Sequence, residues 1–125
     1  MNRKIIVTAS IFGALAVVKG AFGAHGLKEV LTTEQLDQWK TAVNYQFYHT
    51  FALLFLAVLN IRSKLIDTAY WCFLIGIILF SGSIYLLASR SLTGLSGTFL
   101  GPITPVGGMF FIIGWLSVLV AAIKK

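Results

Sequence analysis

Lys19 and His49 are ionisable side chains inside long apolar runs of the sequence, where such groups are functional candidates by default. A lysine there can bind an anionic group, and a histidine can carry a proton or bind a ligand. Counting at ~1.5 Å per residue from the ends of the runs places further polar residues at a similar depth. We therefore predict a ligand-binding polar cluster toward one end of the runs, made of Lys19, His25, Tyr45, Gln46, His49, Ser81, Ser83, Tyr85 and Thr104.

Each candidate also has a simpler structural interpretation. Lys19 is either a binding group or an anchor whose ammonium snorkels to a lipid headgroup. His49 is either a satisfied internal hydrogen-bonding group or a proton carrier, and His25 beside Gly26 needs no special role. The stretch "GPITPVGG" at 101–108 either aims backbone N–H groups at an anion or simply ends a loop and begins a helix.

The composition indicates the elements that position these residues. The 125 residues are 58% hydrophobic and 11% charged, far from the roughly 25% charged average of soluble domains. Four apolar segments are each close to the ~20 residues that cross a bilayer. We predict an all-α, integral membrane four-helix bundle, a single transmembrane domain over residues 1–125, with spans at about 5–25, 43–61, 68–88 and 105–123.

Local signals predict where the helices begin. Thr32 and Gln35 have the spacing of a capping box, so the second helix is expected to start early. Its amphipathic first turns, about 33–42, would lie at the outer surface of the membrane. Asp67 and Thr104 are the predicted N-caps of the third and fourth helices.

Charge predicts the orientation and excludes some partners. Six basic residues fall on one side of the predicted spans and three on the other, so both termini are expected in the cytoplasm. They are Arg3, Lys4, Arg62, Lys64, Lys124 and Lys125 against Lys28, Lys40 and Arg90. The net charge of +6 is scattered instead of forming a stripe, so no nucleic-acid partner is expected. One cysteine and two histidines predict no metal site, and no cofactor is expected.

Small residues on the helices predict close packing. Without a side chain, a glycine lets a neighbouring helix approach closely, which drives association in lipid. The predicted packing residues are Gly13, Gly20, Gly23, Gly82, Gly107 and Gly108. One four-helix unit is too slender to enclose a roomy pathway, and we expect a homo-oligomer in contact with membrane lipids.

Several motifs in order resemble a known family. They are "GAFGAHGL" at 20–27, "W" at 39, "YQFYH" at 45–49, "FSGSIYLL" at 80–87 and "GPITPVGGMFFIIGW" at 101–115. Together they resemble the domain of unknown function 423 family, small multi-pass bacterial membrane proteins of the YgdD-like type. The resemblance implies a four-helix protein of the bacterial plasma (inner) membrane, and it brings no catalytic residue.

Two functions lead, and an enzyme is the third and least favoured interpretation. The first is a non-enzymatic membrane component whose polar cluster holds a lipid headgroup or a small anionic ligand and whose glycines pack helices. The alternative is a small oligomeric transporter or channel for an anion or neutral solute, using Lys19 and His49. No nucleophile with an evident base and orienting acid lies in the spans, so no catalytic residue is predicted.

Overall fold

The computed structural model describes residues 2–124. They form helices joined by short connections and contain no strand. The first half of the chain forms α1 (Asn2–His25) and α2 (Thr33–Val58). The second half contains a long helical rod made of α3 (Lys64–Gly76), a π-helical turn η1 (Ile77–Ser81) and α4 (Gly82–Ala88). Two short helices, α5 (Arg90–Thr93) and α6 (Gly97–Leu100), then lead to the long α7 (Ile103–Lys124). The predicted all-α class is confirmed.

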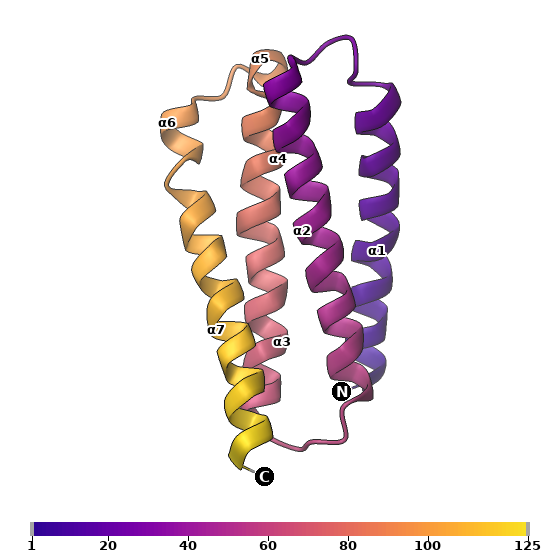
Figure 1. Cartoon of the computed structure of the whole chain (residues 1–125), viewed down its shortest axis with the longest axis vertical. Coiled ribbons are helices and arrows are strands. Elements are labelled where there is room, and N and C mark those ends of the chain that lie inside the picture. Colours follow the sequence, from indigo (N-terminus) through magenta and orange to yellow (C-terminus); the bar gives the residue numbers. More distant parts are fainter. Residues whose placement is uncertain (1, 125) are drawn as a thin grey trace.

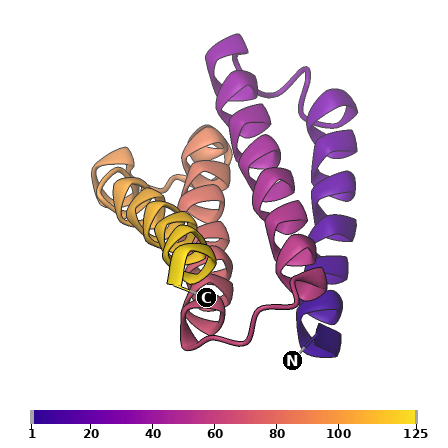
Figure 2. The ribbon, with the colours of Figure 1, turned by 60° about the horizontal axis from the view of Figure 1, so that its bottom comes forward.

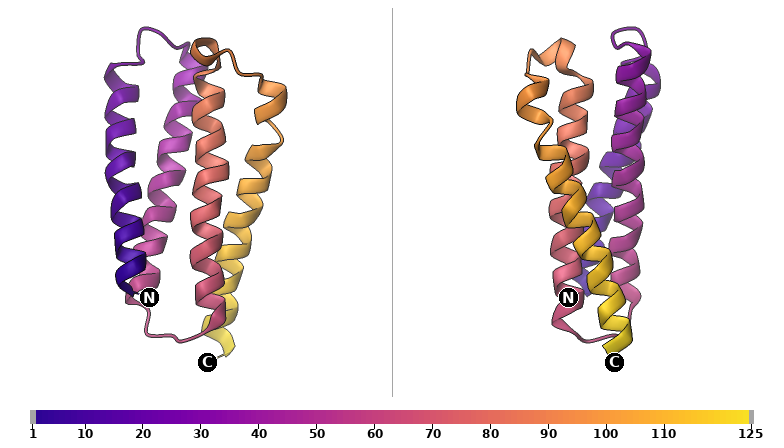
Figure 3. Two further views of the ribbon diagram at one scale, coloured as in Figure 1. Left: turned by 180° about the vertical axis from the view of Figure 1, so that it is seen from behind. Right: turned by 60° about the vertical axis from the view of Figure 1, so that its left-hand side comes forward.

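The long helices lie side by side, and the two ends of the chain lie at the same end of the molecule (Figure 1). Viewed with that end brought forward, α1 pairs with α2, and α3 pairs with α7 (Figure 2). The two pairs are joined mainly through α2, which packs against η1 and α4. The α1–α2 connection, α5 and α6 lie at the opposite end of the long helices (Figure 3). For brevity, we call the end with the termini the terminal end and the other the loop end.

Three helical stretches within residues 2–124 are long and apolar enough to cross a membrane: Arg3–His25, Lys64–Ala88 and Gly97–Lys124. The 26-residue α2 is not among them, because polar residues such as Asn44, Gln46 and His49 interrupt its apolar run. Two of these, Gln46 and His49, are buried inside the bundle. The fourth span predicted at 43–61 therefore stays a prediction.

The helix starts agree with the sequence signals at one position and differ at two. The predicted capping box of α2 is present, with Thr32 Oγ1 accepting from the Gln35 N–H and Gln35 Oε1 accepting from the Thr32 N–H. α3 begins at Lys64 under an N-cap from Ser63, so the prediction for Asp67 was wrong, because Asp67 lies one turn inside the helix. α7 begins at Ile103, so Thr104 is already helical and is not the N-cap.

Glycines sit at the closest helix contacts, with one exception. Gly107 of α7 lies directly on the backbone of Leu79 and Phe80 in the π-helical turn, where an added Cβ would collide with main-chain atoms. Gly23 lies against the Trp39 indole, whereas a Cβ added at Gly13, Gly20 or Gly108 would make only ordinary van der Waals contact. A Cβ on Gly82 would meet nothing within 4 Å, so the predicted packing role of Gly82 was wrong. It faces open space at the end of the π-helical turn.

Candidate functional site

Lys19 lies on α1 about a turn and a half before the helix ends, and its side chain turns toward α4. The ammonium is 4.2 Å from the centroid of the Tyr85 ring, which is a cation–π contact. An ammonium has three donors, and the ring face occupies one side of it. Among residues 2–124, the structure shows neither an ion pair nor a hydrogen-bond acceptor for this group.

Behind Lys19, a hydrogen-bonded chain connects three helices. The Tyr85 hydroxyl donates to Gln46 Oε1 at 2.6 Å, and Gln46 Nε2 donates to the Phe12 carbonyl at 2.7 Å. Both side chains are buried, so each polar atom needs the partner that it has here. Tyr85 is thereby fixed in place, and its ring presents a rigid face to the Lys19 ammonium.

Trp39 completes this group, although the sequence identified it only as one of the motifs shared with a family. Its indole N–H donates to the Lys19 carbonyl at 2.8 Å, and its ring packs on Tyr85 with centroids 4.7 Å apart. The indole fits against α1 because Gly23 has no side chain. We call Lys19, Trp39, Gln46 and Tyr85 the Lys19 group. Trp39 is recognised as a member of the group by its contact with Gly23 between α1 and α2. A single sequence does not reveal which residues of two helices meet in this way.

A groove of about 240 Å³ adjoins the Lys19 group between α1 and α2. Its walls are mostly apolar, formed by residues that include Gly20, Gly23, Trp39 and Val43. Lys28 and Lys40 also line it, so two further cations lie near the loop end of the same helix pair. The sequence pointed to these lysines only as orientation signals.

His49 belongs to a separate group. Its ring stacks on Phe111 with centroids 3.5 Å apart and an interplanar angle of 6°. Nδ1 lies 2.9 Å from the Tyr45 carbonyl, and Nε2 is 3.1 Å from the Trp115 indole nitrogen. Because the carbonyl only accepts and the indole only donates, these bonds fix the neutral tautomer with its proton on Nδ1. The two bonds occupy both ring nitrogens, which favours the structural interpretation of His49 over proton carriage.

The helix register separates Lys19 from His49. The Lys19 carbonyl bonds Trp39, and Gly20 contacts Val43, whereas the Gln46 amide bonds Phe12. Gly13 similarly contacts Thr50, so His49 is level with residues 12–13 of α1. The offset of six to seven residues corresponds to roughly 10 Å along the helix. The expectation of one common level was therefore wrong, because it assumed equal starting depths for α1 and α2.

The other predicted members take different positions. Ser81 donates to the Ala42 carbonyl at 2.8 Å, and Ser83 and Thr104 share a hydrogen bond of 2.6 Å that joins α4 to α7. Tyr45 lies beside His49 and packs its ring on Phe80. His25 is exposed at the last residue of α1 and contacts none of these groups. The serines and Thr104 thus use their hydroxyls to connect helices.

The structure offers no alternative metal centre within residues 2–124. No group of three His, Cys, Asp or Glu side chains there is arranged to hold a metal ion. The Thr50 hydroxyl is the one buried side-chain polar atom of that range without a hydrogen-bond partner. Among the predicted site residues, the Lys19 group is the arrangement that suits a ligand, and its ammonium suits an anion.

Comparisons with known proteins point to one family of membrane proteins. A family model described as "Protein of unknown function (DUF423)" matches residues 19–108. The UPF0382 membrane protein YwdK of Bacillus subtilis is 44% identical over 127 residues, covering 98% of each chain. UPF0382 membrane proteins of Staphylococcus epidermidis and Haemophilus influenzae are 38% and 37% identical, over 98% and 100% of this chain and 97% and 98% of theirs. No solved structure matches.

Proposed function

The chain belongs to the DUF423 family, as its motifs predicted, and from this membership and the geometry around Lys19 we propose a specific role. The protein is a non-enzymatic component of the bacterial plasma membrane that holds an anionic group at Lys19. The anion is a lipid headgroup or a small ligand. The names of its relatives describe membrane proteins and mention no activity.

The observation that carries the proposal is the unbalanced charge of Lys19. A charged side chain within a span normally pairs with another charge or with backbone carbonyls. Here the ammonium rests on the Tyr85 ring and has no acidic neighbour within residues 2–124. An anion at this point would accept hydrogen bonds from the ammonium and complete its coordination. Lys28 and Lys40 in the adjoining groove add positive charge for the same ligand.

We also propose that both termini face the cytoplasm. In the described range, the terminal end carries Arg3, Lys4, Arg62, Lys64 and Lys124, and the loop end carries Lys28, Lys40 and Arg90. The predicted cytoplasmic Lys125 lies outside the described residues. The excess of basic residues at the terminal end supports this orientation, which places the Lys19 group in the outer half of the membrane.

A homo-oligomer surrounded by lipid is the assembly that we propose. In the most apolar stretch of 18 residues in α1, only 17% is buried against the rest of the chain. Large side chains such as Ile11, Val17 and Val18 are exposed on it. This surface is left for acyl chains or a second copy, since exposing it to water would be unfavourable.

The proposal is tested by native mass spectrometry of the protein in mild detergent, with an anionic phospholipid added. Wild type is expected to retain the lipid or a small anion at Lys19. Lys19→Met is expected to lose this one bound molecule, with a fall of at least about tenfold in the affinity of that site, the effect of about 1.4 kcal/mol. Lys124→Met removes the same charge at the terminal end and serves as the control. Equal retention by wild type and Lys19→Met would refute the proposal.

The transport alternative needs Lys19 and His49 on one path. The offset between them and the two bonds that hold His49 do not favour that path. Flux into proteoliposomes is therefore expected to be the same with and without the protein. A solute flux that requires the protein and is lost in Lys19→Met would replace the binding role with transport.

A further inference from the structure

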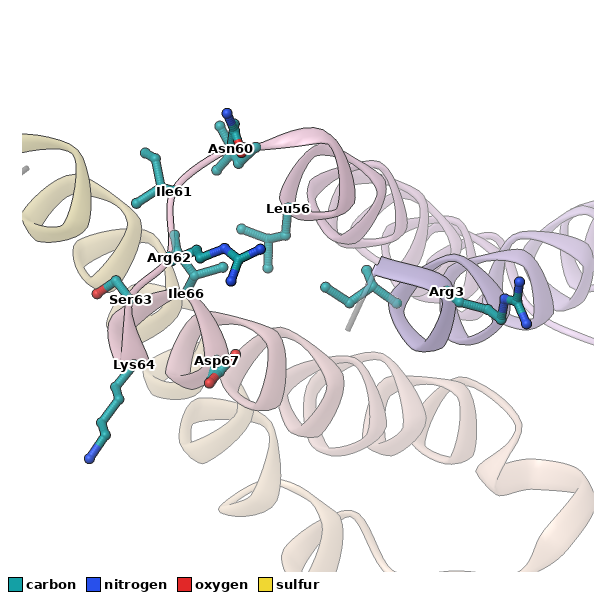
Figure 4. A pocket seen from close by; sticks show the side chains of 11 residues that line it. Arg3, Leu56, Asn60, Ile61, Arg62, Ser63, Lys64, Ile66 and Asp67 are labelled. Carbon is teal, nitrogen blue, oxygen red and sulfur yellow. The ribbon is translucent and has the colours of Figure 1, made fainter.

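A second cavity lies at the terminal end, far along the bundle from Lys19. It has a volume of about 850 Å³ and opens between the first turn of α1, the end of α2 and the α2–α3 connection (Figure 4). This volume lies within the range of about 300–1,000 Å³ typical of ligand pockets. The site is independent of the proposed role of Lys19.

The charged residues around this cavity are mostly basic. Arg3, Arg62 and Lys64 line it together with one acid, Asp67. No ion pair within 4.0 Å neutralises them in the described part of the chain. The cavity therefore has a net positive lining that attracts an anion.

The side chains differ in how they face the cavity. Arg62 extends between Leu56 and Ile66 toward the first turn of α1, whereas Lys64 points away from that space (Figure 4). A guanidinium binds phosphate through two parallel N–H···O bonds, which a lysine does not reproduce. Arg62 is thus placed as the direct ligand, and Arg3 and Lys64 contribute to the surrounding positive potential.

The floor of the cavity is apolar. Ile5, Leu56 and Ile66 form it, and each is buried. Asn60 and Ser63 lie among the polar lining residues of the α2–α3 connection. A cationic group beside an apolar floor suits a ligand with a phosphate joined to a hydrocarbon part, and the volume exceeds what a free phosphate fills.

We propose that this cavity binds the headgroup of an anionic phospholipid, with Arg62 as the ligand of its phosphate. The phosphodiester lies at the Arg62 guanidinium, and the start of an acyl chain lies along Leu59, a half-buried apolar residue of the lining. With the terminal end in the cytoplasm, the bound lipid belongs to the inner leaflet.

The test compares Arg62→Lys with Arg90→Lys in detergent-solubilised full-length protein. Both substitutions keep the charge, and Arg90 lies at the loop end, where it donates to Gln38 and Leu87. Dioleoylphosphatidylglycerol is titrated and binding is followed by native mass spectrometry, with dioleoylphosphatidylcholine as the neutral comparison. Arg62→Lys is expected to weaken phosphatidylglycerol binding at least about fivefold, because the paired hydrogen bonds are lost, and Arg90→Lys to change it less than about twofold.

Competition with inorganic phosphate shows whether the site binds the phosphate of a lipid headgroup or free phosphate. Millimolar phosphate is expected to compete with phosphatidylglycerol in wild type and to have less effect in Arg62→Gln, because both anions use the same guanidinium. In the Lys19→Met background, Arg62→Lys is still expected to weaken the remaining phosphatidylglycerol binding at least about fivefold, which separates this site from the Lys19 group. Equal losses in Arg62→Lys and Arg90→Lys, equal binding of phosphatidylcholine, or binding of phosphate without phosphatidylglycerol would each overturn the proposal. Circular dichroism of every variant verifies its helical content.

Discussion

The hydrogen bond between the Trp115 indole and His49 Nε2 predicts that substitutions of the two residues are coupled. His49→Phe leaves the Trp115 indole N–H without its acceptor, and Trp115→Phe leaves His49 Nε2 without its donor. We expect Trp115→Phe to lower the free energy of unfolding by about 1–3 kcal/mol, because it leaves the buried His49 Nε2 unpaired. His49→Phe should cost less through this bond, because the Trp115 side chain is 46% exposed. The double variant should lose less than the sum by about 1 kcal/mol, because neither unpaired group is then present. Unfolding by SDS in mixed micelles measures all four proteins, and strict additivity would contradict the bond.

Tyr85 joins two contacts that are separable by substitution. Tyr85→Phe removes the hydroxyl that donates to Gln46 but keeps the ring under Lys19. We expect a loss of about 1–3 kcal/mol in the free energy of unfolding, since Gln46 Oε1 is left buried and unpaired. Anion binding at Lys19 should persist in Tyr85→Phe and fall in Tyr85→Leu, which lacks the aromatic face.

The control for Tyr85 is another tyrosine on a long helix. Tyr48→Phe removes a hydroxyl from a side chain that is 55% exposed, and it should leave the free energy of unfolding unchanged. If Tyr85→Phe were as neutral as Tyr48→Phe, the chain from Tyr85 through Gln46 to Phe12 would not be formed. Unfolding in mixed micelles and native mass spectrometry measure the two effects separately.

At the scale of elements, α7 packs directly on the backbone of the π-helical turn at Gly107. Gly107→Ala would place a Cβ against the backbone of Leu79 and Phe80, which a side-chain rotation cannot relieve. We expect a loss of about 1–3 kcal/mol from this overpacking. Gly82→Ala adds the same methyl group into open space, and it should be neutral or stabilising by up to about 1 kcal/mol through helix propensity. Equal effects of the two substitutions on thermal stability in detergent would contradict the register of α7.

The sequence revealed what depends on local chemistry. The start of α2 follows from Thr32 and Gln35, which bond each other across one turn, so the four consecutive residues 32–35 contain the whole signal. At the next helix, Ser63 and Asp67 are both good caps, and only the path of the connection decides that Ser63 is used. The π-helical turn has no sequence signal of its own, and its backbone packs against Gly107 of α7.

The sequence identified several residues of the candidate site correctly, but it did not predict how they are arranged. Lys19, Gln46 and Tyr85 were identified as polar residues in apolar segments, and the structure brings them together. His49 was assigned the same level, but its position depends on how far α2 slides along α1, and no single sequence records that offset. The contacts of Trp39 with Lys19 and of Trp115 with His49 depend on the same pairing of distant segments.

At the scale of the whole molecule, α2 decides how the chain is arranged in the membrane. It is the long helix whose own hydropathy does not identify it as a span, yet it packs on α1 on one side and on η1 and α4 on the other. Its polar side chains bond inside the bundle, as with Gln46 and His49. A helix that satisfies its polar groups internally crosses lipid at less cost than its composition alone suggests.

Cysteine labelling tests this arrangement from both ends of α2. The one native cysteine, Cys72, is buried and is replaced by serine to give a silent background. Lys28→Cys and Leu95→Cys place thiols at exposed positions of the loop end, and Asn60→Cys places one at the terminal end. With both termini in the cytoplasm, a membrane-impermeant maleimide should label positions 28 and 95 in intact spheroplasts and position 60 only after permeabilisation. Labelling of positions 28 and 60 from the same side would mean that α2 does not cross the bilayer, whereas labelling of position 60 alone would reverse the orientation and place the Arg62 cavity on the outside.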